Sequence, residues 1–196
     1  MKLVLATGNK GKLAELRQLL EGTGIQVLPQ SDFGVPDAEE TGLSFIENAI
    51  LKARHAAAHT GLPAMADDSG IEVDALNGAP GIYSARYAGA HGDDAANNAR
   101  LLAALEGLPA AERGARFYCA VAFLRHAEDP TPVIAEGSWE GRILESARGD
   151  GGFGYDPLFF DPTLERSAAE LDPAEKNRVS HRARALRAIA ERLRAR

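Results

Sequence analysis

The chain has 196 residues, 45% of them hydrophobic, so it is long enough to bury a core and too short to require two independent domains. We therefore expect one compact domain spanning residues 1–196. The formal net charge of -6 argues against a protein that binds nucleic acid polymers, which needs a basic surface. No stretch approaches the roughly 20 consecutive apolar residues of a membrane span, so we expect no membrane segment.

Two further features favour a cytoplasmic protein. The N-terminal segment at residues 1–6 turns polar at Thr7, which is too early for the apolar region of a signal peptide. Cys119 is the single cysteine, so no internal disulfide can form, as is usual in a reducing compartment. It lies in the apolar run 117–124, which favours a buried hydrophobe over a reactive thiol.

The chain opens with a strand, a turn and a helix. Residues 3–6 are continuously apolar, so we predict a short buried strand at residues 2–6. A polar, glycine-containing turn follows at residues 7–12. Leucines at helical spacing then predict a helix that ends at Gly22 and Gly24, and residues 25–28 predict a second strand.

The next predicted elements are a loop, a helix and two strands. Residues 32–42 are rich in Asp, Glu, Gly and Pro and predict a loop. Ser44 and Glu47 have capping-box spacing and open a helix that Gly61 ends. Residues 62–66 predict a strand that runs into a polar segment at 67–70. A further strand is expected at 71–76, closed by the turn pair Asn77-Gly78.

The second half continues the alternation, which makes the predicted architecture mixed α/β. We expect a helix at about 93–105, strands at about 115–125 and 132–145, and a glycine-rich loop at 149–154. Asp172 as N-cap and Pro173 at the first helical position start one last helix. Its buried stripe is predicted to be Val179, Ala183, Leu186, Ala190 and Leu193.

The turn at residues 7–12 (Thr7, Gly8, Asn9, Lys10, Gly11, Lys12) has the composition of a phosphate-binding loop. Its glycines allow close backbone approach, the helix start offers unpaired N–H groups, and the lysines add positive charge. It is not a Walker A loop, since Ala6 and Leu13 stand where that motif needs Gly and Ser or Thr. The alternative is an ordinary strand-to-helix turn.

Acidic residues gather near the end of the strand at 62–66. Asp67 and Asp68 follow this strand directly, and Glu39 and Glu40 lie in the preceding loop. Neighbouring acids repel one another, but they suit a hard cation such as Mg²⁺ that bridges phosphate oxygens. An aspartate beside such a site can also take a proton from attacking water. The alternative is turn chemistry at Asp68-Ser69-Gly70.

Two other polar clusters are candidates for substrate contacts. In the segment 151–157, Phe153 is flanked by glycines, so a flat base could stack on its ring. The alternative places Phe153 in the core. In the segment 175–182, Lys176 pairs with Ser180 and Asn177 with His181 on shared helix faces, which could present donors to a base. The alternative is a solvated polar face.

These clusters belong to a set of motifs that matches one family in order and essentially end to end. The motifs are residues 6–12, residues 39–42 with Phe45, Glu47, Asn48, Ala49 and Lys52, and residues 66–70, 78–87, 151–157 and 180–182. On this basis the sequence closely resembles the inosine triphosphate pyrophosphatase family.

The resemblance implies hydrolysis of non-standard purine nucleoside triphosphates (ITP, dITP and XTP) to the monophosphate and pyrophosphate, with Mg²⁺ as cofactor. It implies an α/β fold in which a long central mixed sheet with flanking helices forms two lobes around an active-site cleft. It also implies a homodimer.

The resemblance further implies roles for individual residues. Asp68 would be the catalytic general base and, with Glu40, a metal ligand. The implied substrate-binding residues are Thr7, Gly8, Asn9, Lys10, Gly11, Lys12, Lys52, Ser69, Phe153, Gly154, Tyr155, Asp156, Lys176, His181 and Arg182. Arg182 and His181 are expected to meet the 6-oxo group of hypoxanthine, where adenine instead presents an amino donor.

Two other functions fit parts of the pattern. One is a related pyrophosphatase of the Maf type, acting on pyrimidine or modified nucleotides. The other is a nucleotide-binding regulator without turnover. Asp67, Asp68 and Lys12 together disfavour the regulator, because a passive binder has little use for closely spaced acids beside its phosphate site.

Overall fold

The structure, a computed structural model, describes residues 1–7 and 10–195. Its strands are β1 (Lys2–Leu5), β2 (Gln26–Pro29), β3 (Ala64–Val73), β4 (Gly114–Leu124), β5 (Val133–Ile143), β6 (Phe159–Asp161) and β7 (Arg166–Ser167). Its α-helices are α1 (Lys10–Leu19), α2 (Phe45–Thr60), α3 (Asp94–Ala104), α4 (Pro173–Val179) and α5 (His181–Arg194). Among the described residues, no helix combines the length and the hydrophobicity needed to cross a membrane.

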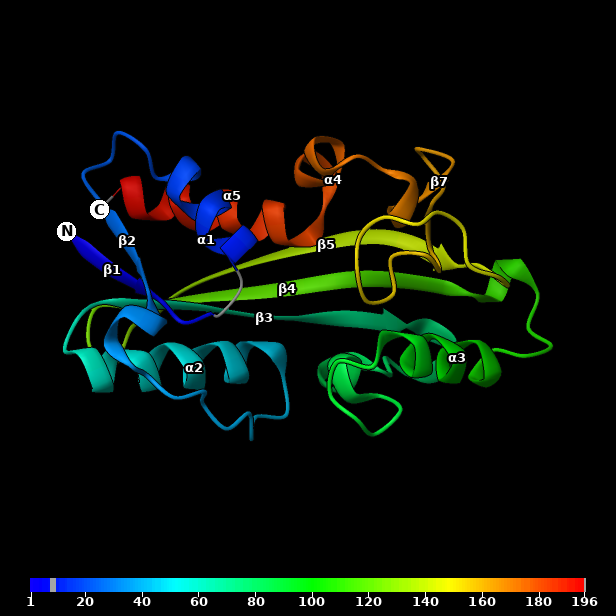
Figure 1. Cartoon of the computed structure of the whole chain (residues 1–196), viewed down its shortest axis with the longest axis horizontal. Coiled ribbons are helices and arrows are strands. Elements are labelled where there is room, and N and C mark those ends of the chain that lie inside the picture. The colour runs from blue at the N-terminus through cyan, green and yellow to red at the C-terminus, as the bar shows by residue number, and fades with distance from the viewer. Residues whose placement is uncertain (8–9, 196) are drawn as a thin grey trace. The chain divides into compact units, whose positions relative to one another are not determined.

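The strands form one mixed sheet in the order β2-β1-β3-β4-β5-β6-β7. β1 pairs in parallel with both β2 and β3, whereas β6 pairs antiparallel with β5 and β7. Within the first unit, α2 lies on one side of the strands and α1 and α5 lie on the other, and within the second unit α3 and α4 lie on opposite sides (Figure 1). The predicted mixed α/β architecture is confirmed.

The chain divides into two compact units. The first unit comprises Met1–Asp68, Cys119–Gly137 and Arg184–Arg196, and the second comprises Ser69–Tyr118 and Ser138–Ala183. Neither unit is a continuous segment, because β3, β4 and β5 each contribute residues to both.

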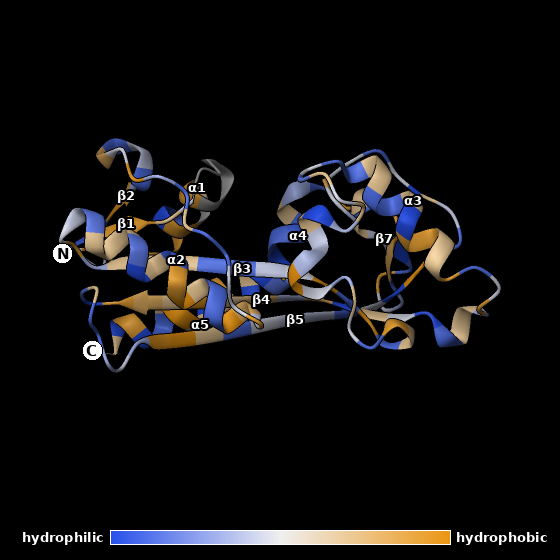
Figure 2. Cartoon of the chain, turned by 90° about the horizontal axis from the view of Figure 1, so that it is seen from below, coloured by the Kyte–Doolittle hydropathy of each residue, from blue (hydrophilic) through white to orange (hydrophobic). Residues whose placement is uncertain are grey.

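The core of the first unit has two layers because alternate residues of a strand point to opposite faces. Leu3 and Leu5 of β1 pack in one apolar cluster with residues of α1 and α5, including Leu16 and Ile189. Val4, between them, packs on the other face with alanines of α2. In Figure 2, α5 alternates between hydrophobic and hydrophilic residues, as expected of a helix with one buried stripe.

The core of the second unit is rich in aromatic side chains. Phe117 of β4, Trp139 of β5 and Phe159 of β6 contact one another, with ring centroids 4.6–6.2 Å apart. Leu101 of α3 joins the same cluster with no exposed surface. Cys119 is also buried, as predicted, but in the first unit.

The helix signals in the sequence act as predicted for α2. Ser44 is the N-cap and accepts a hydrogen bond from the backbone N–H of Glu47. Glu47 Oε2 in turn accepts from Ser44 Oγ and from the N–H of Leu43. Gly61 ends the helix in the left-handed conformation that favours glycine.

The prediction of two strands separated by a polar segment at residues 67–70 is wrong. Asp67, Asp68, Ser69 and Gly70 all lie within the continuous strand β3. β1 pairs with β3 at Ala64 and Met65, before this segment, so β4 is the neighbour that keeps the backbone extended where turn-forming residues alone would bend it. The predicted strand at 71–76 accordingly ends at Val73, and a short 3₁₀ turn at Asp74–Leu76 leads to Asn77.

The prediction of one last helix is also wrong. Asp172 and Pro173 begin a helix as expected, but it ends at Val179, and Ser180 is extended with φ -64° and ψ 153°. Ser180 Oγ then accepts a hydrogen bond from the N–H of Ala183 and so caps α5. Lys176 with Ser180, and Asn177 with His181, therefore do not share a face of one helix.

Arg113 is a buried connector between α3 and β5. It is 3% exposed, and its guanidinium donates to the carbonyl oxygens of Leu105, Ile143 and Leu144 at 2.9–3.0 Å.

The Arg113→Ala variant is expected to lose on the order of 3 kcal/mol of unfolding free energy, because three buried carbonyls lose a charged donor. Urea unfolding followed by circular dichroism measures the loss. Arg192→Ala, at an exposed position on α5, is the control and should leave the midpoint unchanged.

Candidate functional site

The acidic residues of β3 are buried, which is unusual for carboxylates. Asp67 is 6% and Asp68 8% exposed, so neither behaves as a solvated turn residue. A buried carboxylate requires a compensating charge or hydrogen bonds. The turn interpretation of this segment is therefore excluded, and the charge that compensates Asp68 identifies the rest of the group.

Lys52 supplies that charge, and its ammonium forms ion pairs with two carboxylates, those of Asp68 and Glu40. Lys52 Nζ lies 2.8 Å from Asp68 Oδ1 and 2.7 Å from Glu40 Oε1. Lys52 comes from α2, Asp68 from β3 and Glu40 from the loop before α2, so three separate segments of the first unit meet here. The structure thus brings together three residues that the sequence predicted to act in the site.

The proximity of these charges changes their proton affinities. Burial disfavours the ammonium of Lys52, but the carboxylates of Asp68 and Glu40 more than offset this and raise its pKa above the ordinary value. Burial raises the pKa of Asp68, against the opposing effect of Lys52. A carboxylate with a raised pKa is a stronger base than one in water, which suits proton abstraction.

Asn48 completes this group, although sequence reasoning gave it no role. Its side chain has no exposed surface, and Nδ2 donates to Asp68 Oδ2 at 3.3 Å. Its Oδ1 accepts from the N–H of Gly42 at 2.8 Å, so Asn48 ties the Glu40 loop to Asp68. The sequence did contain a signal that could have identified Asn48: it is a polar residue one turn before Lys52, on the face of α2 that is otherwise lined with alanines.

The two carboxylates on Lys52 have the chemistry of a magnesium site. Mg²⁺ prefers oxygen ligands and is usually held by one or two carboxylates together with water and phosphate oxygens. Glu40 and Asp68 already converge on a single cation, the Lys52 ammonium, so their oxygens fit such an ion. Among the described residues, no group of three or more His, Cys, Asp and Glu is arranged for a metal.

The predicted phosphate loop falls mostly outside the described part of the chain. Thr7 is half-buried, and its N–H donates to the carbonyl of Leu5 at 2.9 Å. Gly8 and Asn9 lie outside the described residues, as do the side chains of residues 10–12. Helix α1 begins at Lys10, directly after the loop, where a helix N-terminus was expected.

In the second unit, the glycine-rich loop presents an aromatic ring to solvent. Phe153 is 58% exposed, so the alternative that placed it in the core is excluded. Cations lie over the ring, with Lys176 Nζ 4.6 Å and Arg182 Cζ 5.9 Å from its centroid. Arg182 Nη2 also donates to Ser69 Oγ at 3.1 Å. Ser69, Phe153, Lys176 and Arg182 therefore form one cluster.

Asp156 and Tyr155 support this loop from below the surface. Asp156 is 2% exposed, and its Oδ2 accepts from the N–H of Phe153 at 2.8 Å and from Lys176 Nζ. A Cβ on Gly152 would lie 2.1 Å from Asp156 Oδ2, so this close approach requires glycine. The hydroxyl of Tyr155 donates to the carbonyl of Ser84, and burial raises the Tyr155 pKa.

His181 is buried rather than presented on the surface. It is 7% exposed and stacks on Phe117 with a centroid distance of 4.8 Å and an interplanar angle of 12°. Its neighbour Arg182 is half-buried and reaches the Phe153 cluster. The predicted pair of base contacts therefore consists of one buried ring and one half-buried guanidinium.

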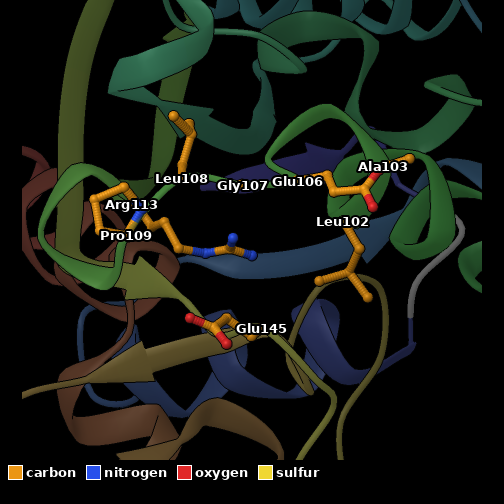
Figure 3. A pocket seen from close by; sticks show the side chains of 8 residues that line it. All are labelled: Leu102, Ala103, Glu106, Gly107, Leu108, Pro109, Arg113 and Glu145. Atoms are coloured by element: carbon orange, nitrogen blue, oxygen red, sulfur yellow. The ribbon is translucent and has the colours of Figure 1, made fainter.

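A separate hollow of about 650 Å³ lies beside the C-terminal end of α3 (Figure 3). Leu102, Leu108, Pro109 and the guanidinium of Arg113 line it, with Glu106 and Glu145 beside them. No residue predicted for the site is among its described lining residues. Arg113 already donates to three backbone carbonyls there, so we assign it a structural role.

Comparison with known proteins extends over the whole chain. The model of the Ham1 family matches residues 3–192. A dITP/XTP pyrophosphatase of Thioalkalivibrio sulfidiphilus is 71% identical over 196 residues, which cover 100% of both chains. A dITP/XTP pyrophosphatase of Xanthomonas oryzae pv. oryzae is 60% identical, over 98% of this chain and 97% of the relative.

A solved structure supports the same relationship. The HAM1 protein of Coxiella burnetii superposes with a TM-score of 0.96 at 50% identity, covering 100% of each chain. The family predicted from the motifs is thereby confirmed. The chain belongs to the Ham1 family.

Proposed function

We propose that the protein hydrolyses non-standard purine nucleoside triphosphates, namely dITP, XTP and ITP, to the monophosphate and pyrophosphate. The observation that carries the proposal is the convergence of Glu40 and Asp68 on one buried cation position, held by Lys52. The full-length relatives named dITP/XTP pyrophosphatase supply the substrate class. The non-continuous units support a single functional domain over residues 1–196.

In the proposed reaction, Asp68 is the general base. A water oxygen attacks the α-phosphorus, its proton passes to the Asp68 carboxylate, and the bond from the α-phosphorus to the bridging oxygen breaks. Pyrophosphate leaves with the electron pair of that bond. The raised pKa of Asp68 favours the proton transfer. Asn48 orients the carboxylate through its bond to Oδ2.

We propose Mg²⁺ as the cofactor, with Glu40 and Asp68 as its protein ligands. When bound, it neutralises charge on the phosphate oxygens. Lys52 and Ser69 would contact the triphosphate, together with the N-terminal loop (Thr7, Gly8, Asn9, Lys10, Gly11 and Lys12). The helix start at Lys10 supports this role, because N–H groups at a helix N-terminus attract anions.

We propose that the purine stacks on Phe153 within the loop of Phe153, Gly154, Tyr155 and Asp156, and that Arg182 and His181 select its 6-oxo group. The exposure of Phe153 supports stacking, and the position of Arg182 near the ring supports a direct contact with the base edge. Because His181 is buried, we propose that it contributes to base selection indirectly, by orienting Arg182. Lys176 would contact the nucleotide beside the ring, and the position of its Nζ 4.6 Å from the ring centroid supports this role.

The Phe153→Ala variant tests base stacking. Loss of the ring is expected to raise KM for ITP about 5- to 150-fold, the equivalent of the 1–3 kcal/mol that aromatic stacking contributes per base. Steady-state kinetics with ITP measure the change. Phe33→Ala, another exposed aromatic residue, is the matched control and should behave as wild type. An unchanged KM in Phe153→Ala would contradict the stacking role.

A substrate panel tests the proposed function itself. Pyrophosphate release is measured for ITP, dITP, XTP, the standard purine triphosphates and pyrimidine triphosphates, with and without Mg²⁺. We expect turnover of ITP, dITP and XTP above the others, and only with Mg²⁺. Preference for pyrimidine nucleotides would instead identify a Maf-type activity, and tight ITP binding without turnover would identify a regulator.

We also propose a homodimer that acts on free nucleotides in the cytoplasm, without a nucleic acid polymer or membrane as partner. The net charge of -6 supports small nucleotides over polymers. The single buried cysteine is compatible with a reducing compartment. Light scattering of the purified protein measures the oligomeric state.

A further inference from the structure

Two side chains of α3, those of Asp94 and Asn98, form hydrogen bonds with both backbone polar groups of Gly154, and we call this pair of bonds the grip. Asp94 Oδ2 accepts a hydrogen bond from the N–H of Gly154 at 2.7 Å. Asn98 Nδ2 donates to the carbonyl of the same residue at 2.8 Å. Asp94 and Asn98 are four residues apart and so lie on one face of the helix. All three residues belong to the second unit.

These contacts determine the conformation of the loop that carries Phe153. Gly154 has φ 62°, in the left-handed region, and bonds on both sides hold it there. The backbone of Phe153 itself is also restrained, because its N–H donates a hydrogen bond to Asp156 Oδ2. An exposed aromatic ring therefore stands on a backbone that hydrogen bonds restrain at Phe153 and at Gly154.

Further hydrogen bonds restrain the Asn98 side chain and helix α3. Asn98 Nδ2 also donates to the carbonyl of Asp94 at 2.7 Å, so both hydrogens of its amide are used and the amide cannot turn without losing bonds. The far end of α3 is tied by Arg113 through the carbonyl of Leu105. The neighbouring Asn97 has a different task, since it bonds the N–H of Ala88 and the carbonyl of Ala85.

We propose that Asp94 and Asn98 are positioning residues for the nucleobase, which hold the Phe153 ring where the purine of the substrate stacks. This inference rests on the proposed function. Neither side chain is required to touch the substrate. Loss of the grip leaves the ring present but free to adopt several orientations, so the base must order it on binding. Binding weakens, while the chemistry at the α-phosphorus does not depend on either residue.

Two variants remove the grip from opposite sides. Asn98→Ala deletes the donor to the Gly154 carbonyl and raises helix propensity, so a weakened helix cannot account for its effect. Asp94→Ala deletes the acceptor, and Asp94→Asn restores one, because an amide oxygen can also accept from the Gly154 N–H. The matched control is Asp93→Ala, which deletes the N-cap bond to Ala96 without touching Gly154.

The expected result is a binding defect limited to the base. Asn98→Ala and Asp94→Ala should each raise KM for ITP and the dissociation constant of IMP about 10-fold, a part of the full stacking contribution. kcat should stay near wild type, and Asp94→Asn should recover most of the affinity. Inhibition by tripolyphosphate, which has no base, should be unchanged. Asp93→Ala should bind IMP as wild type does.

A double-mutant cycle separates positioning from a general structural role. Asn98→Ala in the Phe153→Ala background should cause no further loss of IMP affinity, because the ring that Asn98 positions is already absent. Additive losses would overturn the inference, as would a defect in Asp93→Ala equal to that of Asp94→Ala. If the wild type hydrolyses ITP while both grip variants match it, only this inference fails. If the wild type neither binds IMP nor hydrolyses ITP, the proposed function fails as well.

Discussion

The Asp68→Asn variant is expected to lower kcat for ITP hydrolysis by at least about 100-fold, the lower end of the contribution of positioned proton transfer. Asparagine has the same shape, and its one side-chain oxygen can still accept from Lys52 or from Asn48, but not from both. The variant loses the group that accepts the proton of the attacking water, and with it the negative charge beside Lys52. Single-turnover hydrolysis at saturating ITP measures the chemical step directly.

Glu39→Gln is the matched control for this variant. Glu39 neighbours Glu40 in the same loop but is exposed, so removing its charge should leave kcat unchanged. Circular dichroism and a thermal melt establish that each variant is folded. If Asp68→Asn retained more than a tenth of the wild-type kcat, Asp68 could not be the general base.

The Lys52→Met variant is expected to have the second large effect, a loss of kcat/KM of about 100-fold or more. Loss of one preorganised group that stabilises developing charge typically lowers kcat by about 10²–10³-fold. Lys52 also separates two carboxylates, and without its ammonium Glu40 and Asp68 would repel each other across a buried site. Lys2→Met removes the same charge from an exposed position on β1 and should be silent.

The pH profile of Lys52→Met provides a second measurement. Burial raises the pKa of Asp68, and the ammonium of Lys52 opposes that rise. Removing the ammonium should therefore raise this pKa further. A base works only when deprotonated, so the acidic limb of the kcat/KM profile should move to higher pH. A limb that stays in place, or moves to lower pH, would show that Lys52 does not act on Asp68.

Local signals in the sequence were sufficient for many of the elements. The capping pair Ser44 and Glu47, the terminating Gly61, and the start at Asp172 and Pro173 all depend on hydrogen bonds between residues a few positions apart. Such interactions act wherever the segment lies in the fold, so a pattern of spacing predicts them. The short strands β6 and β7 carry no pattern of this kind and were not predicted.

The two wrong predictions arose where contacts between distant segments decide the structure, because local patterns do not reveal such contacts. Asp68 to Gly70 have the composition of a turn, but they lie within β3, and the neighbouring strand β4 keeps this part of the strand extended. Ser180 interrupts the last helix because Val179 packs in the core of the second unit and Leu186 in that of the first. In both cases packing outweighs a weak local preference.

The sequence by itself determined the family, the mixed α/β class and most of the residues proposed to bind the substrate, because short motifs carry the chemistry of a site. Only the tertiary structure decided which of them meet: Lys52 with Glu40 and Asp68 in the first unit, and Phe153 with Lys176 and Arg182 in the second. It alone gave roles to Asn48, Asp94 and Asn98, whose partners are distant along the chain. Hydrogen bonds between distant segments form only once the whole chain has folded, so no local pattern encodes them.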